Sequence, residues 1–239
     1  MKRKNVLKTP LLFLGGLCLL MSSCKKENNN TTASINYNST IKYGEITDAD
    51  SNTYKTVQIG TQTWMAQNLR TTKYNNGTKI RLITVDAIWI DSGRPAMCWY
   101  SNNPSKYKET YGALYNGYAV DTNILCPKGW HIPSDNEWQI LITYVGGDIG
   151  KLRESGTSHW EAPNSGASNA SGFTALPTGL REPFYGSSSS MGQMTEWLTS
   201  TSLDNVNSAS RFIDEDNAGT TKNEEPRLMG LPVRCLKNE

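Results

Sequence analysis

Oxygen-bearing side chains alternate between residues 48 and 52. Asp48, Asp50 and Asn52, with the backbone carbonyl of Tyr54, offer the carboxylate, amide and carbonyl oxygens that calcium prefers. An EF-hand loop would continue to a bidentate glutamate, and none stands at the required position. The alternative is a turn in which these side chains bind their own backbone. The pattern therefore indicates either a calcium site or a turn that needs no cofactor.

Seven tryptophans and eleven tyrosines form the second group of informative side chains, because flat aromatic faces suit sugar rings. Trp64, Trp130 and Trp138 fall within strand and helix patterns, so we expect them in the core. The aromatic residues of the loop-rich parts are the candidates for contact with a ligand. They are Trp99, Tyr100, Trp160, Tyr185 and Trp197. Each of these five can instead anchor its own loop.

Cys24 stands at the end of a leader-like segment. Three basic residues at positions 2–4 precede an apolar run over residues 11–21, which is shorter than the roughly 20 residues that span a bilayer. Ser22 and Ser23 then precede Cys24, and this arrangement resembles the lipoprotein box of bacteria. The sequence predicts a signal peptide over residues 1–23 and a lipid on Cys24. The alternative is an uncleaved signal anchor.

The residue after Cys24 bears on localisation. Lys25 stands where an aspartate is associated with retention in the inner membrane, so the outer membrane is favoured. Residues 25–27 also resemble a short charged export signal of surface lipoproteins. We therefore expect a lipid-anchored protein of the outer membrane that is exposed at the cell surface.

Three further cysteines, Cys98, Cys126 and Cys235, remain after the leader. An exported protein meets oxidising conditions, so one disulfide and one remaining thiol are expected. The three cysteines show no C-x-x-C spacing, and neither His131 nor His159 has a second histidine four residues away. The sequence therefore gives no support for a zinc site.

Composition narrows the possible classes of protein. The 239 residues are 37% hydrophobic and 19% charged, which excludes a polytopic membrane protein. The net charge of +2 depends on Lys2, Arg3, Lys4 and Lys8, because the rest of the chain has 20 basic and 22 acidic residues. No basic surface is expected to neutralise phosphates, so nucleic acid is not an expected partner.

The remaining elements follow from local patterns. Residues 24–40 are polar and aperiodic, which predicts a flexible tether before a domain over residues 41–239. Residues 54–60 and 62–66 predict a hairpin, and residues 81–90, 129–133 and 231–236 predict further strands. Ser134 and Glu137 form a capping box, so a helix is expected over residues 135–145, with one apolar face. That face consists of Trp138, Leu141, Ile142 and Val145.

Five ordered blocks resemble the Fibrobacter succinogenes major paralogous domain. They are residues 54–69, 111–116, 126–138, 172–177 and 232–236. This family is similar to the C-type-lectin-like superfamily, which also contains sulfatase-modifying enzymes. The resemblance implies an α+β fold with a small twisted antiparallel sheet, one or two helices and long loops. In such a fold the segments that carry Cys126 and Cys235 share a sheet, which favours a bond between them; a bond that involves Cys98, or none, is the alternative.

Two functional classes follow from the resemblance. One is a non-catalytic binding or adhesion module of the cell envelope, with a glycan or protein ligand. The other is an oxidase that resembles the formylglycine-generating enzymes, which rely on a close pair of cysteines near the chain end. Cys235 stands alone there, and no Ser/His/Asp motif replaces the pair. We therefore favour the binding module.

Overall fold

The computed structural model describes residues 33–215 and 221–239. The predicted signal peptide, Cys24 and residues 24–32 of the predicted tether lie outside the described residues. In chain order, the strands are β1 (Gly44–Thr47), β2 (Thr53–Ile59), β3 (Gln62–Met65), β4 (Met97–Cys98), β5 (Leu114–Tyr115), β6 (Trp130–His131), β7 (Leu180–Arg181), β8 (Ser188–Ser189), β9 (Met194–Ser202), β10 (Asn207–Asp214), β11 (Thr221–Pro226) and β12 (Leu236–Lys237). The α-helices are α1 (Asp86–Ile90), α2 (Pro104–Tyr111), α3 (Gly117–Val120) and α4 (Asp135–Tyr144). The segments Tyr100–Asn102 and Ile149–Lys151 form 3₁₀ turns.

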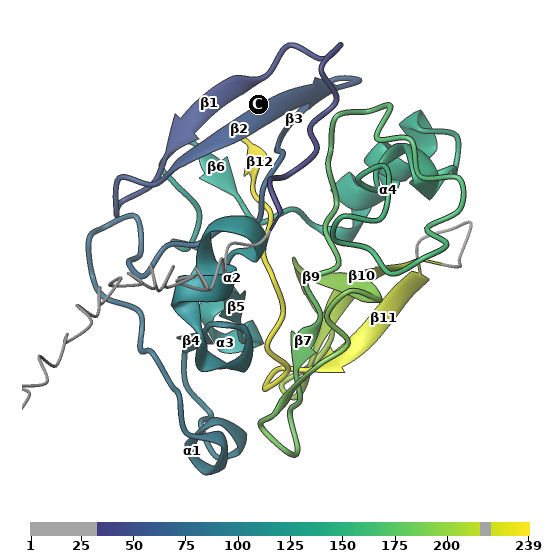
Figure 1. The fold of residues 1–239 in the computed structure, drawn as a ribbon. Helices are drawn as coiled ribbons and strands as arrows, with labels where there is room; N and C mark the ends of the chain where they lie inside the picture. Colours follow the sequence, from purple (N-terminus) through teal and green to yellow (C-terminus); the bar gives the residue numbers. More distant parts are fainter. Residues whose placement is uncertain (1–32, 216–220) are drawn as a thin grey trace, which may run out of the picture. The chain divides into compact units, whose positions relative to one another are not determined.

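Two antiparallel sheets dominate the fold (Figure 1). The first has the order β1-β2-β3-β12-β6, so the last strand of the chain lies between the opening hairpin and β6. The second has the order β11-β10-β9, and two short hairpins, β4-β5 and β7-β8, accompany them. Small antiparallel sheets with short helices give an α+β fold, as expected. Among the described residues there are four α-helices rather than one or two.

The opening hairpin and α4 form where local signals predict them. β2 pairs with β3, and Val57 lies opposite Trp64. Ser134 accepts a hydrogen bond from the backbone N–H of Glu137, whose side chain accepts one in return from the backbone N–H of Ser134, which completes the capping box. Trp138 on the apolar face of α4 is fully buried, which confirms the predicted orientation of this helix.

The core between α4 and the sheets is built from aromatic rings. Trp138 lies 4.9 Å from Trp64, 5.2 Å from Trp197 and 5.7 Å from Phe173, measured between ring centroids. All four side chains are fully buried. Aromatic pairs at these distances add stabilisation beyond that of the area they bury. This cluster joins α4 to both large sheets.

One expectation about local structure is wrong, and a second segment makes contacts that its composition did not indicate. Residues 81–90 were expected to hold a strand, yet they contain α1, and only an isolated bridge joins Leu82 to Met97. Residues 33–40, which the composition places in a flexible tether, contact the domain. The backbone N–H of Asn36 donates to Glu154 Oε1 over 2.6 Å, and Asn38 Nδ2 donates to the carbonyl of Asn169 over 3.0 Å. Polar composition did not reveal that these asparagines have specific partners.

Within the described residues, no helix has the length and hydropathy needed to cross a bilayer.

Candidate functional site

The disulfide expected from the family resemblance is present. Cys126 and Cys235 are bonded, with their Cα atoms 5.9 Å apart. Cys235 directly precedes β12, and Cys126 lies four residues before β6. These two strands are paired, with Leu236 opposite His131. Both cysteines are almost completely buried. Cys98 is also buried, and burial raises the pKa of its thiol to about 11.

The five aromatic candidates for ligand contact differ in how far their side chains are buried. Trp160 and Trp197 are 1% and 0% exposed, and Trp99 and Tyr100 are 5% and 9% exposed. A ring enclosed by protein cannot stack on a sugar, so these four residues act as packing residues in this structure. Tyr185, by contrast, is 78% exposed. It is the one member of the predicted set whose ring a ligand can reach.

The segment that offered calcium ligands forms a hydrogen-bonded turn. Asp48 Oδ1 accepts from the backbone N–H groups of Asp50 and Asn52, at 2.8 and 3.0 Å. Asp48 Oδ2 accepts from Asn52 Nδ2 at 2.8 Å and from the hydroxyl of Tyr54. These contacts favour the turn, in which the side chains bind their own backbone, over the calcium site. Nowhere in residues 33–215 and 221–239 do three or more His, Cys, Asp or Glu side chains form a group that could hold a metal ion.

The second carboxylate of this turn is also engaged by the protein. Asp50 Oδ1 lies 3.0 Å from Lys73 Nζ, and Asp50 Oδ2 accepts from the backbone N–H and the hydroxyl of Thr72. Burial raises the pKa of Asp50, but hydrogen bonds from Thr72 and Lys73 outweigh it and lower the pKa to about 2. The carboxylate therefore stays ionised and fixes the turn to residues 71–73.

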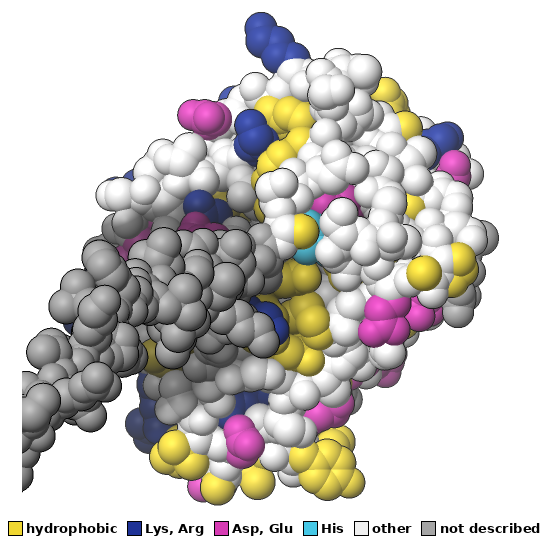
Figure 2. Space-filling view, in the orientation of Figure 1, with side chains coloured by type: hydrophobic (Ala, Val, Ile, Leu, Met, Phe, Trp, Pro, Cys, Tyr) yellow, Lys and Arg dark blue, Asp and Glu magenta, His cyan; other side chains and the backbone are white. Residues whose placement is uncertain are grey.

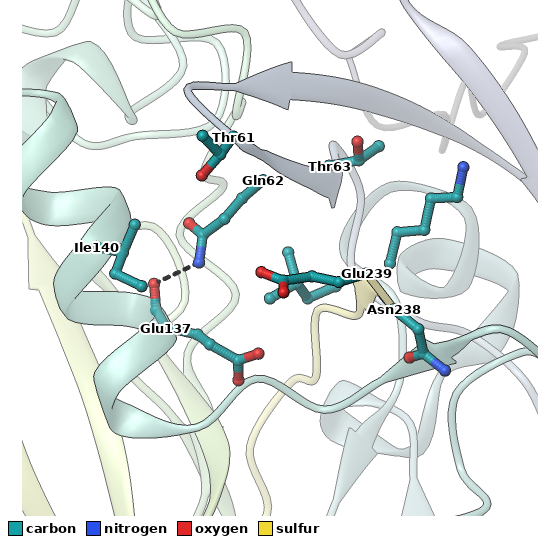
Figure 3. Close-up of a pocket in the computed structure, with 9 residues that line it drawn as sticks. Thr61, Gln62, Thr63, Glu137, Ile140, Asn238 and Glu239 are labelled. Carbon is teal, nitrogen blue, oxygen red and sulfur yellow. Dashed lines mark hydrogen bonds between the residues drawn. The ribbon is translucent and has the colours of Figure 1, made fainter.

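A small polar cavity lies between the opening hairpin and α4 (Figure 3). It has a volume of about 100 Å³, and Gln62 Nε2 donates across it to the carbonyl of Glu137 over 3.0 Å. The Glu137 side chain completes the cap of α4 and lies 2.8 Å from His131 Nε2. The other ring nitrogen, Nδ1, lies 2.8 Å from Asn238 Oδ1. Because these polar groups already form hydrogen bonds with one another, their contacts indicate that the residues around this cavity have a structural role.

The second histidine has a buried carboxylate partner. His159 Nδ1 lies 2.7 Å from Glu154 Oε2, and His159 Nε2 donates to the carbonyl of Ala33 over 3.0 Å. Burial lowers the pKa of His159, but the hydrogen bond and charge of Glu154 outweigh it and raise the pKa above its usual value. This pair fastens residues 33–36 to the domain.

The feature most suited to recognition is a set of exposed apolar side chains, here called the apolar end. The side chains come from the α1 segment and from the turn between β7 and β8. They are Leu82, Val85, Ile88, Ile90, Phe184 and Tyr185, with exposed fractions from 39% to 78%. Figure 2 shows hydrophobic side chains at the lower edge of the view, where Figure 1 places α1 and the turn after β7. Several large apolar side chains exposed on neighbouring segments are a common feature of binding sites.

One buried arginine joins the two segments of the apolar end. Arg181 Nη2 lies 2.8 Å from Asp86 Oδ1, and Nη1 donates to the carbonyl of Ile83 over 2.7 Å. Arg181 Nε donates to the carbonyl of Gly186 over 2.7 Å, and the guanidinium lies 4.6 Å from the centroid of the buried Trp89 ring. The exposed side chains are thus presented by a fixed backbone. A surface held in this way loses little conformational entropy when it binds a partner.

Gly186 allows this close approach. Its φ angle is +70°, a region that side chains with a Cβ rarely adopt. A Cβ at this position would lie 2.7 Å from the carbonyl oxygen of Asp86. A glycine is therefore required where the turn after β7 meets α1.

These observations define an α+β domain with two small antiparallel sheets, a buried disulfide and a rigid apolar end. The family model of the Fibrobacter succinogenes major domain matches residues 57–237, more than half of the chain. The chain belongs to this family, as the five sequence blocks predicted. Comparison with curated proteins and with solved structures gives no match. The wider C-type-lectin-like relationship stays a prediction.

Sequence reasoning identified only Tyr185 among the six side chains of the apolar end. Four of the others were missed because they lie within residues 81–90, which were interpreted as a strand, in which alternate side chains are buried. Phe184 was missed because an aromatic side chain in a loop does not reveal its own exposure. No local signal in the sequence indicated this exposure, because Val and Ile are residue types that are usually buried.

Proposed function

We propose that this protein is a lipid-anchored, non-catalytic binding or adhesion module of the outer membrane that recognises a glycan or a protein through its apolar end. The observation that carries the proposal is the exposure of six large apolar side chains on two segments joined by Arg181. Apolar surface exposed to water is unfavourable unless a partner covers it. The fixed backbone supports recognition of a partner of defined shape.

The thiols do not favour the alternative oxidase. Such chemistry needs an accessible thiol with a lowered pKa. Cys126 and Cys235 are bonded to each other, and burial raises the pKa of Cys98. No observation among the described residues supports a reactive cysteine pair.

The apolar end is tested by removing its apolar character. Ile88→Ser together with Phe184→Ser is expected to weaken ligand binding at least about tenfold, because central apolar contacts dominate binding energies. Binding is measured on a glycan array and on immobilised envelope proteins, with the soluble form that begins at Lys25. Val206→Ser and Ile140→Ser are matched controls, since both side chains are exposed by more than half elsewhere on the domain. Equal loss in the controls, or full binding by the double variant, would contradict the proposed site.

Anchoring is tested at Cys24. The variant Cys24→Ala is expected to accumulate as an unprocessed precursor that takes up no radioactive palmitate, because the acceptor thiol is absent. Cell fractionation should move the protein out of the outer-membrane fraction, since several acyl chains are needed for stable anchoring. Cys18→Ala serves as the matched control and should be labelled normally. Normal labelling of Cys24→Ala would show that the lipid is elsewhere.

A further inference from the structure

A polar hollow adjoins the apolar end. It has a volume of about 460 Å³, which falls within the usual range for small-molecule sites. It is lined by Arg81, Asp91, Ser92, Gly93 and Arg94. Its lining residues are chain neighbours of Leu82 and Ile90, so the hollow lies on the segment that supplies the α1 part of the apolar end.

The backbone around the hollow is held in place by the body of the domain. The carbonyl of Arg81 accepts from the backbone N–H of Met97 at 2.9 Å. The carbonyl of Arg94 accepts from Asn116 Nδ2 at 2.8 Å, and Asn116 is fully buried. The backbone N–H of Ser92 donates to the carbonyl of Trp89 over 3.1 Å. Both arginines therefore start from fixed positions, which suits them to bind one ligand together.

The polar groups of the hollow lack partners in the described part of the chain. No hydrogen bond or ion pair there engages the guanidinium of Arg81, the guanidinium of Arg94 or the carboxylate of Asp91. Ser92 is 4% exposed, and its buried Oγ has no hydrogen-bond partner. A buried hydroxyl without a partner is unfavourable, so it calls for an explanation. By contrast, each of the three guanidinium nitrogens of Arg181 donates to an acceptor of the protein.

The combination of groups narrows the chemistry of the ligand. Guanidinium groups bind carboxylates through paired, charge-assisted hydrogen bonds. The carboxylate of Asp91 can only accept, so it suits the hydroxyl groups of a ligand. A sugar that carries a carboxylate offers both kinds of group on one ring. The lining has no apolar side chain, so it offers little to the side chains of an acidic peptide.

We infer that this hollow binds the carboxylate-bearing sugar unit of an acidic glycan, with Arg81 and Arg94 as the carboxylate ligands. The inference rests on the proposed binding function and specifies its ligand class. Adjacent sugars of the glycan then extend across the apolar end, where their C–H faces contact Leu82, Ile90 and the exposed ring of Tyr185. The carboxylate provides orientation and the apolar end provides contact area.

The test uses the full chain in detergent and three uronate oligosaccharides, built from galacturonate, mannuronate and glucuronate. At least one is expected to bind in calorimetric titration, and its methyl ester, which has the same rings without the charge, is expected to bind at least about tenfold more weakly. Arg81→Gln and Arg94→Gln should each weaken uronate binding about tenfold, from the loss of one charge-assisted pair. Lys42→Gln, which removes an exposed charge just before β1, should bind as the wild type does. Thermal melts establish that each variant is folded.

Several results would overturn the inference. They are binding of none of the three uronates, binding that is unchanged in both arginine variants, or binding only of a sulfated oligosaccharide that lacks carboxylates. An acidic peptide of alternating Asp and Gly that binds as tightly as the best uronate would also overturn it, because charge alone would then suffice. Ile88→Ser with Phe184→Ser is measured separately on the glycan and protein arrays. Loss of array binding there, without uronate binding, would refute the sugar-acid site and leave the proposed function standing.

Discussion

Replacement of Trp138 by alanine is expected to lower the free energy of unfolding by about 3–5 kcal/mol, the range for loss of a large buried aromatic side chain. Trp138 is fully buried, and its ring lies against Trp64, Phe173 and Trp197. Alanine would leave a cavity bordered by three rigid rings, which limits how far the core can relax. The measurement is chemical denaturation followed by circular dichroism.

Two variants make this result specific. Trp138→Phe keeps a ring in the cluster and removes an indole N–H that has no partner in the described structure, so its effect should be smaller than that of alanine. Ile140→Ala changes a half-exposed side chain on the same helix and should alter stability by less than about 0.5 kcal/mol. A loss below about 1 kcal/mol for Trp138→Ala would show that α4 packs through another face.

Local sequence signals correctly predicted the elements that are specified by residues only a few positions apart. The cap formed by Ser134 and Glu137 and the apolar spacing after it define both the start of α4 and its buried face. The period of two in residues 54–60, followed by a glycine turn, defines the opening hairpin in the same way. These patterns are predictive because the residues that form the required hydrogen bonds, or that share the buried face, are close together in the sequence.

The parts that failed depend on distant residues. Residues 81–90 are rich in β-branched side chains, but α1 is held by Arg181, about 95 positions later in the chain. Asn36 is fixed by Glu154, which is 118 positions away. Trp197 donates to Asn68 Oδ1, 129 positions away, and is thereby enclosed in the core. Sequence patterns around each residue contain no trace of such contacts, so burial of the aromatic candidates and exposure of the apolar end had to come from the structure.

Loss of the Cys126–Cys235 bond is expected to destabilise the domain by about 4–5 kcal/mol in the chain-entropy model, since the bond closes a loop with a sequence separation of 109 residues. The variant with Cys126→Ala and Cys235→Ala should show this loss in chemical denaturation. Reductant should lower the stability of the wild type and leave the double variant unchanged. Cys98→Ala, which leaves the bond intact, should keep the sensitivity to reductant.

Thiol reactivity then separates the two functional classes discussed for this family. Peptide mapping of the non-reduced protein should recover residues 126 and 235 linked. Cys98 should be alkylated slowly, because its side chain is buried and burial raises its pKa to about 11. Arg234 precedes Cys235, but its guanidinium is directed at Asn68 Oδ1 over 3.0 Å and lies 4.2 Å from the Phe173 ring centroid. That positive charge is therefore committed to the core, so we expect no activated thiol at Cys235. Rapid reaction of Cys235 with iodoacetamide at neutral pH, without reductant, would contradict the structural bond and favour the oxidase.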